Sequence, residues 1–339
     1  MPTVERFRPD DRTAVDELFR RVFGDASAES NRQRWEWQYL RNPHSPGGEA
    51  PIWLLREGDA IVGQLATIPV KISVNGAEIN GSWAADMMIA PEQQRRGLGE
   101  ILLRTWDRNA GAAVALSMTD ASHALVTKRG WSDLGKIPRL VRTPKAAARR
   151  GRLASLVRAI VRELVARFRP LDGEIRRVAR FDAGITRLWD RVAPRFAFAV
   201  RRDAPYLNWK FVDAPHATYS IATLVRGAET AGYVVYRQVR QDQRRIIMLV
   251  DFLADPADPA ALRALLSWLD READAAGAEA IRVFSSHADF RETFHESGYV
   301  SRRPTLRFIG KINAVPVPPT FFDSLDGWHV TMGDSDVDR

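Results

Sequence analysis

The stretch from Met87 to Leu103, MMIAPEQQRRGLGEILL, decides the fold of this chain. An apolar run ends at Pro91, a polar turn with two arginines and two glycines follows, and an apolar-periodic segment begins near Gly99. The pattern predicts a strand, a loop and a helix over Gly99–Asn109. Glycine lets the loop backbone approach a ligand closely, and the first helical turn leaves N–H groups without partners. We therefore expect the loop to bind an anion such as pyrophosphate.

The same stretch resembles the acyl-CoA signature of the GCN5-related N-acetyltransferase (GNAT) superfamily, Gln/Arg-x-x-Gly-x-Gly/Ala. Here the signature reads Gln94-x-x-Gly97-x-Gly99. Further along, Lys128, Gly130 and Trp131 match the end of the family motif Tyr-Glu-Lys-x-Gly-Phe. The resemblance implies an α/β (α+β) fold, in which helices flank a mixed, mostly antiparallel central sheet, and an enzyme that transfers an acyl group from acyl-CoA.

The resemblance also implies where acetyl-CoA, the expected co-substrate, is bound. Its pantetheine arm would lie between two splayed strands, Asp86–Ala90 and Ala113–Ser117, with a backbone N–H near Met88 facing the thioester oxygen. The N–H groups of the loop would hold the pyrophosphate, and Thr119 stands where the family often has an asparagine that touches pantetheine. The residues expected at the cofactor are Met87, Met88, Ile89, Gln94, Arg95, Arg96, Gly97, Leu98, Gly99 and Thr119.

Two residues are candidates for proton transfer. Asp86, at the start of the central strand, can act as the general base directly or through water; the alternative is a structural carboxylate, which its recurrence as Asp251 supports. Val126 stands where the family often has the tyrosine that protonates the leaving thiolate, and His123 can take that role instead. The chain has no obvious nucleophile, which favours direct transfer over a covalent intermediate.

An internal repeat indicates two related domains in tandem. Trp37–His44 resembles Trp209–His216, 172 residues further on, and Asp86 is matched by Asp251. Lys128–Trp131 is matched in the same order by Glu296–Tyr299. We predict an N-terminal domain over 1–138, a basic amphipathic linker helix over 139–174, a second domain over 175–312 and a C-terminal tail over 313–339.

The second copy departs from the first at the anion loop. After Pro256 the chain reads Ala257-Asp258-Pro259-Ala260, without Gly-x-Gly and with acidic residues around the turn. A carboxylate repels a phosphate, so we expect this degenerate copy to bind CoA poorly. It would then serve as support or as a wall of the acceptor site.

The linker and the tail each leave alternatives open. The linker has one apolar stripe from Leu153 to Phe168, which predicts a helix that packs the domains together, contacts an anionic membrane surface through 145–170, or remains a flexible connection. The tail from Trp328 to Asp338 alternates partly and ends acidic. It predicts either a terminal strand with a frayed end or an acidic segment that reaches a cleft and holds an amine.

Composition sets further bounds. The chain has 339 residues, a formal net charge of +8 and no cysteine, which excludes disulfides and fits a cytoplasmic protein. Contact with the inner membrane face is the alternative location. The six histidines have no paired metal-ligand spacing, and no apolar run approaches the ~20 residues of a spanning helix. We expect no metal; the charge permits a polyanionic partner, but no nucleic acid is expected. Oligomeric state does not follow from the sequence.

The leading hypothesis is an N-acetyltransferase that moves an acetyl group from acetyl-CoA to an amine, such as an amino sugar, a glycan precursor or another small amine. One alternative is a tandem transferase that uses aminoacyl-tRNA; the intact loop around Gly97 argues against it. The other is a non-catalytic acyl-CoA-binding scaffold at an anionic membrane, which Val126 in place of tyrosine favours.

Overall fold

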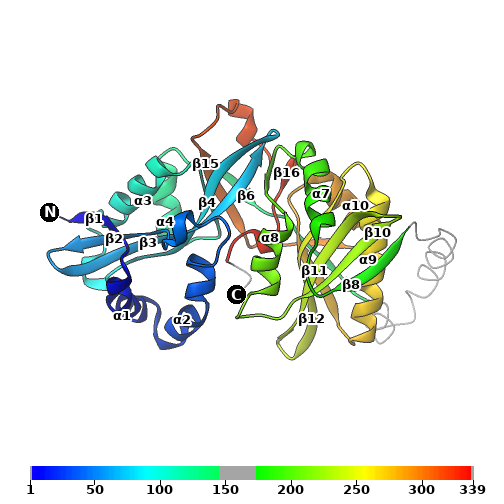
Figure 1. Ribbon diagram of the computed structural model, residues 1–339, viewed down its shortest axis with the longest axis horizontal. Coiled ribbons are helices and arrows are strands. Elements are labelled where there is room, and N and C mark those ends of the chain that lie inside the picture. Colours follow the sequence, from blue (N-terminus) through cyan, green and yellow to red (C-terminus); the bar gives the residue numbers. More distant parts are fainter. Residues whose placement is uncertain (1, 145–172, 337–339) are drawn as a thin grey trace.

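The computed structural model describes residues 2–144 and 173–336. Two mixed, mostly antiparallel sheets, each flanked by helices, form two halves that lie side by side (Figure 1). This architecture confirms the fold class expected from the sequence.

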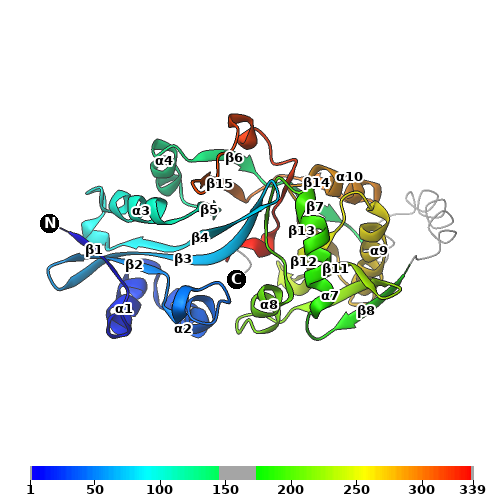
Figure 2. The same cartoon turned by 45° about the horizontal axis from the view of Figure 1, so that its top comes forward.

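The first sheet is ordered β1-β2-β3-β4-β5-β15-β6. All neighbours on this path are antiparallel apart from β4 and β5, which are parallel. Its strands are β1 (Thr3–Arg6), β2 (Ile52–Glu57), β3 (Ala60–Val74), β4 (Ala77–Ile89), β5 (Ala112–Leu116), β6 (Ser132–Lys136) and β15 (Arg307–Ile312). Helices α1 (Arg12–Phe23) and α2 (Asp25–Tyr39) cover one face, and α3 (Leu98–Asn109) and α4 (Asp120–Lys128) cover the other (Figure 2).

Strand β3 is longer than the sequence pattern indicated. Ala60–Val70 and Lys71–Val74 read as two segments of a hairpin-like series, but the chain continues as one strand through both. The strand continues past Val70 because Val70, Ile72 and Val74 all face the core. A turn follows at Asn75-Gly76, where φ is +49° and +83°, values typical of a tight hairpin turn.

The second sheet repeats this plan in the order β14-β7-β13-β12-β11-β10-β8, most of which is labelled in Figure 2. Its strands are β7 (Arg139–Arg142), β8 (Glu174–Val178), β10 (Ser220–Arg226), β11 (Glu229–Gln241), β12 (Arg244–Ala254), β13 (Ala280–Phe284) and β14 (Val300–Arg302). Its helices are α7 (Ala183–Val192), α8 (Ala204–Leu207), the π-helical turn η6 (Asn208–Val212), α9 (Pro259–Ala275) and α10 (Ala288–Glu296).

The two halves exchange a strand. β7, which directly follows the first half in sequence, lies between β13 and β14 of the second sheet. β15, from the end of the second half, lies between β5 and β6 of the first. Each exchanged strand is held by an ion pair to its host: Arg142 of β7 to Asp270 of α9, and Lys311 of β15 to Asp107 of α3 at 2.8 Å. Each sheet is therefore completed by the other half of the chain.

The exchange corrects part of the linker prediction. The range 139–174 was expected to be helical throughout, but it begins with strand β7 and its last residue opens β8. Arg139–Arg142 extends because it fills a vacant place in the second sheet, which a local pattern does not reveal. The apolar stripe from Leu153 to Phe168 lies outside the described residues.

Equivalent tryptophans of the repeat meet at the junction. Trp37 and Trp209 stack with ring centroids 5.0 Å apart and planes at 19°. Trp37 Nε1 donates to the Trp209 carbonyl at 2.7 Å, and Trp209 Nε1 donates to the Trp37 carbonyl at 2.8 Å. A reciprocal contact of this kind is what a two-fold interface produces. Together with the reciprocal strand exchange, it relates the halves by an approximate two-fold axis.

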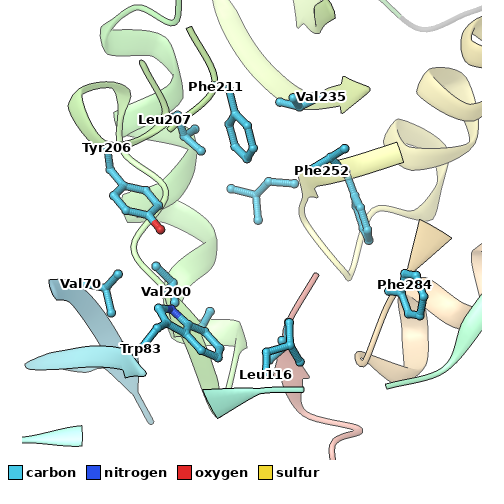
Figure 3. Packing of buried hydrophobic residues seen from close by; sticks show 14 of the residues in the cluster. Val70, Trp83, Leu116, Val200, Tyr206, Leu207, Phe211, Val235, Phe252 and Phe284 are labelled. Atoms are coloured by element: carbon cyan, nitrogen blue, oxygen red, sulfur yellow. The ribbon is translucent and has the colours of Figure 1, made fainter. Parts of the chain in front are cut away.

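One apolar core runs across the junction. β9 (Phe198–Val200), from the second half, pairs with β3, and β16 (Trp328–His329) pairs with β9. Phe198 stacks on Trp328 with centroids 4.3 Å apart, and Phe308 of β15 contacts both rings and Trp83. Figure 3 shows labelled members of this cluster from both halves.

We predict that the halves unfold together. Phe308 is fully buried among rings from both halves, so Phe308→Ala should lower the free energy of unfolding by about 3–5 kcal/mol. Tryptophan fluorescence and far-ultraviolet circular dichroism should still report one coincident transition in urea. Leu40→Ala, at a side chain 38% exposed, is the control and should change stability by less than about 0.5 kcal/mol. Two separated transitions would contradict the shared core.

Candidate active site

Strands β4 and β5 part at a bulge. Their parallel pairing begins where Gly81 faces Ala112 and ends where Trp83 faces Val114. β4 then continues to Ile89 beyond the last paired position. Opposite β3, Met88 faces Gln64 and Ala85 faces Ala66, so two residues of β4 oppose one of β3. Asp86 lies in this bulge with φ +43°, a conformation uncommon for a residue other than glycine. The bulge bends β4 away from β5, as the splayed strands of the resemblance require.

The anion loop follows β4 directly. Gly97 has φ +77° and is the N-cap of α3, and no side chain caps this helix. A glycine cap leaves the first-turn N–H groups for a ligand, and the helix dipole favours an anion there. A Cβ on Gly97 would meet nothing within 4 Å, whereas one on Gly99 would lie 3.2 Å from Met87 Cε. Gly97 thus serves the backbone conformation, and Gly99 serves close packing against β4.

The side chains of the loop have separate tasks. Arg95 is exposed, while Arg96 pairs with Glu57 of β2 at 3.0 Å, which offsets part of its charge. Gln94 Nε2 donates to the Ile89 carbonyl at 3.2 Å and ties the loop to the end of β4. Leu98 is buried in the cluster beneath α3, so it can offer a ligand its backbone but not its side chain.

The residues of α4 have three different roles: a helix cap, a buried core residue and a member of an ion pair. Thr119 Oγ1 accepts the Ser122 N–H at 3.2 Å and caps the helix. Val126 is 4% exposed within the apolar cluster under α3 and has no proton to donate. Leu125 is the α4 residue nearest Gly99. His123, two residues earlier, projects from a different side of the helix.

His123 is engaged with two charged residues. Its Nε2 lies 2.7 Å from Asp133 Oδ2 on β6 and 3.1 Å from Arg307 Nη1 on β15. Burial raises the pKa of Asp133, but the Gly135 N–H, His123 and Arg307 outweigh it, and the pKa lies below its ordinary value. Arg307 was missed by sequence reasoning because it arrives on the exchanged strand, 184 residues from His123.

The Asp86 carboxylate is 9% exposed and accepts two bonds at one oxygen. Tyr39 OH donates to Asp86 Oδ2 at 2.6 Å and Asn31 Nδ2 donates at 2.9 Å. Burial, and then the charge of Asp86, raise the pKa of Tyr39 well above 10, so the phenol keeps its proton and donates it to the carboxylate. Both donors come from α2. Asn31 was missed by sequence reasoning.

The matching carboxylate of the second half has different partners. Asp251 Oδ1 lies 3.0 Å from Arg202 Nη2, and Asp251 also accepts from Tyr233 and Thr331. Arg202 binds Asp334 as well, at 2.8 Å. Despite burial, which lowers it, the pKa of Arg202 is raised by these two carboxylates. The buried arginine neutralises Asp251, which makes this carboxylate structural.

In the second half, other parts of the chain contact both the place where the parallel strands part and the N-terminus of the following helix. β12 and β13 pair from Ile246–Ala280 to Leu249–Val283, and beyond that point the C-terminal segment Trp328–Asp334 lies against both strands. The Val330 N–H donates to Ser286 Oγ, and the Ser286 N–H donates to the Val330 carbonyl. His329 Nε2 lies 2.8 Å from the Phe252 carbonyl. A Cβ on Gly333 would be 3.2 Å from the Val250 carbonyl. The C-terminal segment therefore fills the space where β12 and β13 part.

The start of α9 is capped by the chain as well. Asp258 accepts the Ala261 N–H at 3.3 Å, Pro259 begins the helix, and Arg226 pairs with Asp258. An internal carboxylate thus stands where the first half would receive a phosphate. These contacts give a physical reason for the expectation that the second copy binds CoA poorly.

A small cavity lies between the halves, close to Asp86. It is lined by Arg34, Trp37, Gln38, Ile68, Lys210, His216, Tyr219, Ser335 and Asp336. The charges of Asp336 and Arg34 both act on Tyr39, which places the cavity beside the Asp86–Tyr39 pair. Gln38 is 1% exposed, and within the described residues neither of its amide atoms has a hydrogen-bond partner. The tail therefore does reach this cavity as far as Asp336; residues 337–339 lie outside the described part.

Two further findings concern metals and membranes. In residues 2–144 and 173–336, no group of three or more His, Asp or Glu side chains is arranged to hold a metal ion. Over the same residues, no helix combines the length and apolar character needed to cross a membrane.

Comparison with known proteins identifies the class. Residues 3–132 match the family model described as an acetyltransferase (GNAT) domain. A search of the curated proteins finds no match. The first half is therefore a GNAT acetyltransferase domain, and the protein is an acyltransferase.

Solved structures share the fold over nearly the whole chain. A GCN5-related N-acetyltransferase from Anabaena variabilis ATCC 29413 is 13% identical, with 92% of this chain and 73% of that chain covered and a TM-score of 0.64. One from Kribbella flavida is 16% identical, with coverage of 93% and 71% and a TM-score of 0.63. Saccharomyces cerevisiae N-myristoyltransferase with bound myristoyl-CoA is 12% identical, with coverage of 96% and 88% and a TM-score of 0.55.

We predict that acidification destabilises the fold through His329. This fully buried histidine has a pKa well below 6.5, because of burial and then the charge of Arg202. The unfolded chain binds a proton near pH 6.5 while the folded chain does not, so stability is complete above that pH and falls as the pH decreases below it. Urea midpoints at pH 7.5 and 5.0 measure the loss. His329→Gln, which cannot titrate, should show a smaller decrease between the two pH values; an equal decrease would contradict the assignment.

Proposed function

We propose that the protein transfers an acetyl group from acetyl-CoA to an amine by direct attack, with acetyl-CoA bound in the first half. One observation carries the proposal: β4 turns away from β5 at the Asp86 bulge and leads straight into the uncapped N-terminus of α3. The corresponding places in the second half are taken by the segment Trp328–Asp334 and by Asp258.

The loop supplies the groups that a pyrophosphate requires. The N–H groups at the start of α3, together with the helix dipole, favour a bound phosphate. The exposed Arg95 adds positive charge. Arg96 adds less, because Arg96 also pairs with Glu57. Leu98 and Met88 have buried side chains, so their backbone groups would face the ligand. Thr119, at the start of α4, borders the same cleft as a helix cap.

The backbone of β4 offers a donor for the thioester oxygen. Ala90 N–H donates to the Val62 carbonyl of β3 at 2.9 Å. Backbone N–H groups alternate in direction along a strand, so the N–H of Ile89, next to Met88, points away from β3 toward the diverging strand β5. A donor aimed at this position would stabilise the oxyanion that forms during attack.

The chemical step is a single displacement. The amine lone pair attacks the thioester carbonyl carbon, the C–N bond forms, the C–S bond breaks and coenzyme A leaves as the thiolate. The proton lost by the attacking nitrogen passes to Asp86, directly or through water. Protonation of the thiolate falls to His123 or to solvent, since Val126 carries no proton.

The attacking amine would approach the thioester from the side of the cavity between the halves. Trp37 and Gln38 come from the first half, and His216 and Tyr219 from the second, so the second half forms a wall of the site. The cavity holds only about one water molecule (about 10 Å³), so it can admit the amine group but not the body of an acceptor such as an amino sugar or a glycan precursor.

We predict that Gly97→Glu abolishes acetyl-CoA binding. The new carboxylate would lie at the phosphate position, and φ +77° strains any residue other than glycine. Calorimetric titration should give one site per wild-type chain and affinity at least about tenfold weaker in the variant, a loss of ~1.4 kcal/mol or more. Gly227→Glu, at φ +60° in an open turn of the second half, is the matched control and should bind normally. Absence of binding by the wild type would overturn the proposal, and two sites would overturn its one-site form.

We predict that Asp86→Asn lowers kcat with an amine acceptor by about 10²–10⁴-fold and leaves the dissociation constant of acetyl-CoA within twofold. If Asp86 is instead a structural carboxylate, the variant loses stability in urea but keeps most of its kcat. A scaffold would differ from both, since it would bind acetyl-CoA and release no coenzyme A with any amine in a panel.

A further inference from the structure

One face of the second sheet gathers arginines from four strands. Arg139 of β7 pairs directly with Arg302 of β14, so the two share a face. Arg282 of β13 pairs with Val141 and with Met248. Since alternate residues of a strand share a face, Arg282 lies on the side of Arg139, and Arg244 lies on the side of Met248. We call Arg139, Arg244, Arg282 and Arg302 the arginine face.

This face is opposite the helix α9. Arg142, next to Val141 on β7, points the other way and pairs with Asp270 of α9. Arg244 and Arg302 are exposed, and Arg139 and Arg282 are half-buried. The arginines therefore lie on the side of the sheet away from α9, and the exposed Arg244 and Arg302 are in reach of a partner.

The arrangement is electrostatically unfavourable for the protein alone. Like charges directly opposite each other destabilise a sheet, as Arg139 and Arg302 do here. Burial, and then the charges of Arg139 and Arg244, lower the pKa of Arg282, against an opposing effect of Asp242. Glu279 lies 3.8 Å from Arg244. Asp242 and Glu279 offset part of the positive charge of the four arginines, and a bound anion would relieve the rest.

We propose that the arginine face binds the sugar-phosphate backbone of a nucleic acid. Guanidinium groups bind phosphates with paired hydrogen bonds. Nucleic-acid interfaces are strongly positively charged, as this face is. The formal net charge of +8 favours the same partner.

The sequence did not lead us to expect a nucleic acid, because the four arginines are spread from 139 to 302 and meet only in the folded sheet. The face continues toward the cavity between the halves. Arg237 pairs across the ladder with Met248, and its guanidinium lies 6.0 Å from the ring of Tyr219, which lines that cavity. The proposal does not depend on acetyl transfer.

The test is fluorescence anisotropy of a labelled 20-base RNA hairpin at 50 to 300 mM salt. We expect the logarithm of affinity to fall linearly with the logarithm of salt concentration, with a slope of about −3 for four phosphate contacts. The variant R139Q/R282Q/R302Q should bind at least about tenfold more weakly, with a slope smaller in magnitude by about 2. The control R176Q/R180Q/R191Q removes the same charge from arginines that pair with Glu174, Asp213 and Glu229 and should bind as the wild type does.

Equal losses in the two triple variants would show attraction by net charge alone and overturn the proposal. So would absence of RNA binding, or binding of poly-glutamate in preference to RNA, which would assign the face to an acidic protein. Calorimetry with acetyl-CoA on the same preparations checks the first half separately, so failure here leaves the proposed acetyl transfer untouched and the converse also holds.

Discussion

The exchange of β7 and β15 is the constraint on which the rest of the structure depends. A sheet that lacks an interior strand leaves two rows of backbone groups without partners, and here each half supplies the strand that the other lacks. The exchange holds the two halves in a fixed relation, with Trp37 against Trp209. That relation creates the cavity beside Asp86 from residues of both halves. The first half has the loop and the bulge, but its site is bounded only in the presence of the second.

The two halves share one backbone feature, the divergence of two parallel strands, but differ in what lies beside it. In each, the central strand carries an aspartate where it diverges from its parallel neighbour. In the first half, the divergence leads to a helix begun by Gly97, which leaves its N–H groups to a ligand. In the second half, Asp258 caps the helix and the C-terminal segment packs along the strands. Arg202 between Asp251 and Asp334 stabilises this packing of the C-terminal segment.

The sequence predicts local structure well and long-range contacts poorly. The run from Met87 to Leu103 specifies strand, loop and helix through neighbouring residues, and the structure reproduces all three. The turn at Asn75-Gly76 is local in the same way. Arg139–Arg142 extends only because a place is vacant in a distant sheet, and Arg307 reaches His123 only through the exchange. Asn31 gives no sign of its bond to Asp86, because an asparagine within a helix is most often a surface residue.

The strand exchange also constrains the order in which the protein can be made. During synthesis the first half emerges before the second, but the place between β5 and β6 stays empty until β15, at Arg307–Ile312, has left the ribosome. A nascent chain with most of the second half still to come would expose the edges of β5 and β6, with Trp83 lacking the cover of Phe308. Exposed edges pair readily with other chains. The first sheet is therefore completed only after β15 has been synthesised, and until then its open edges favour aggregation.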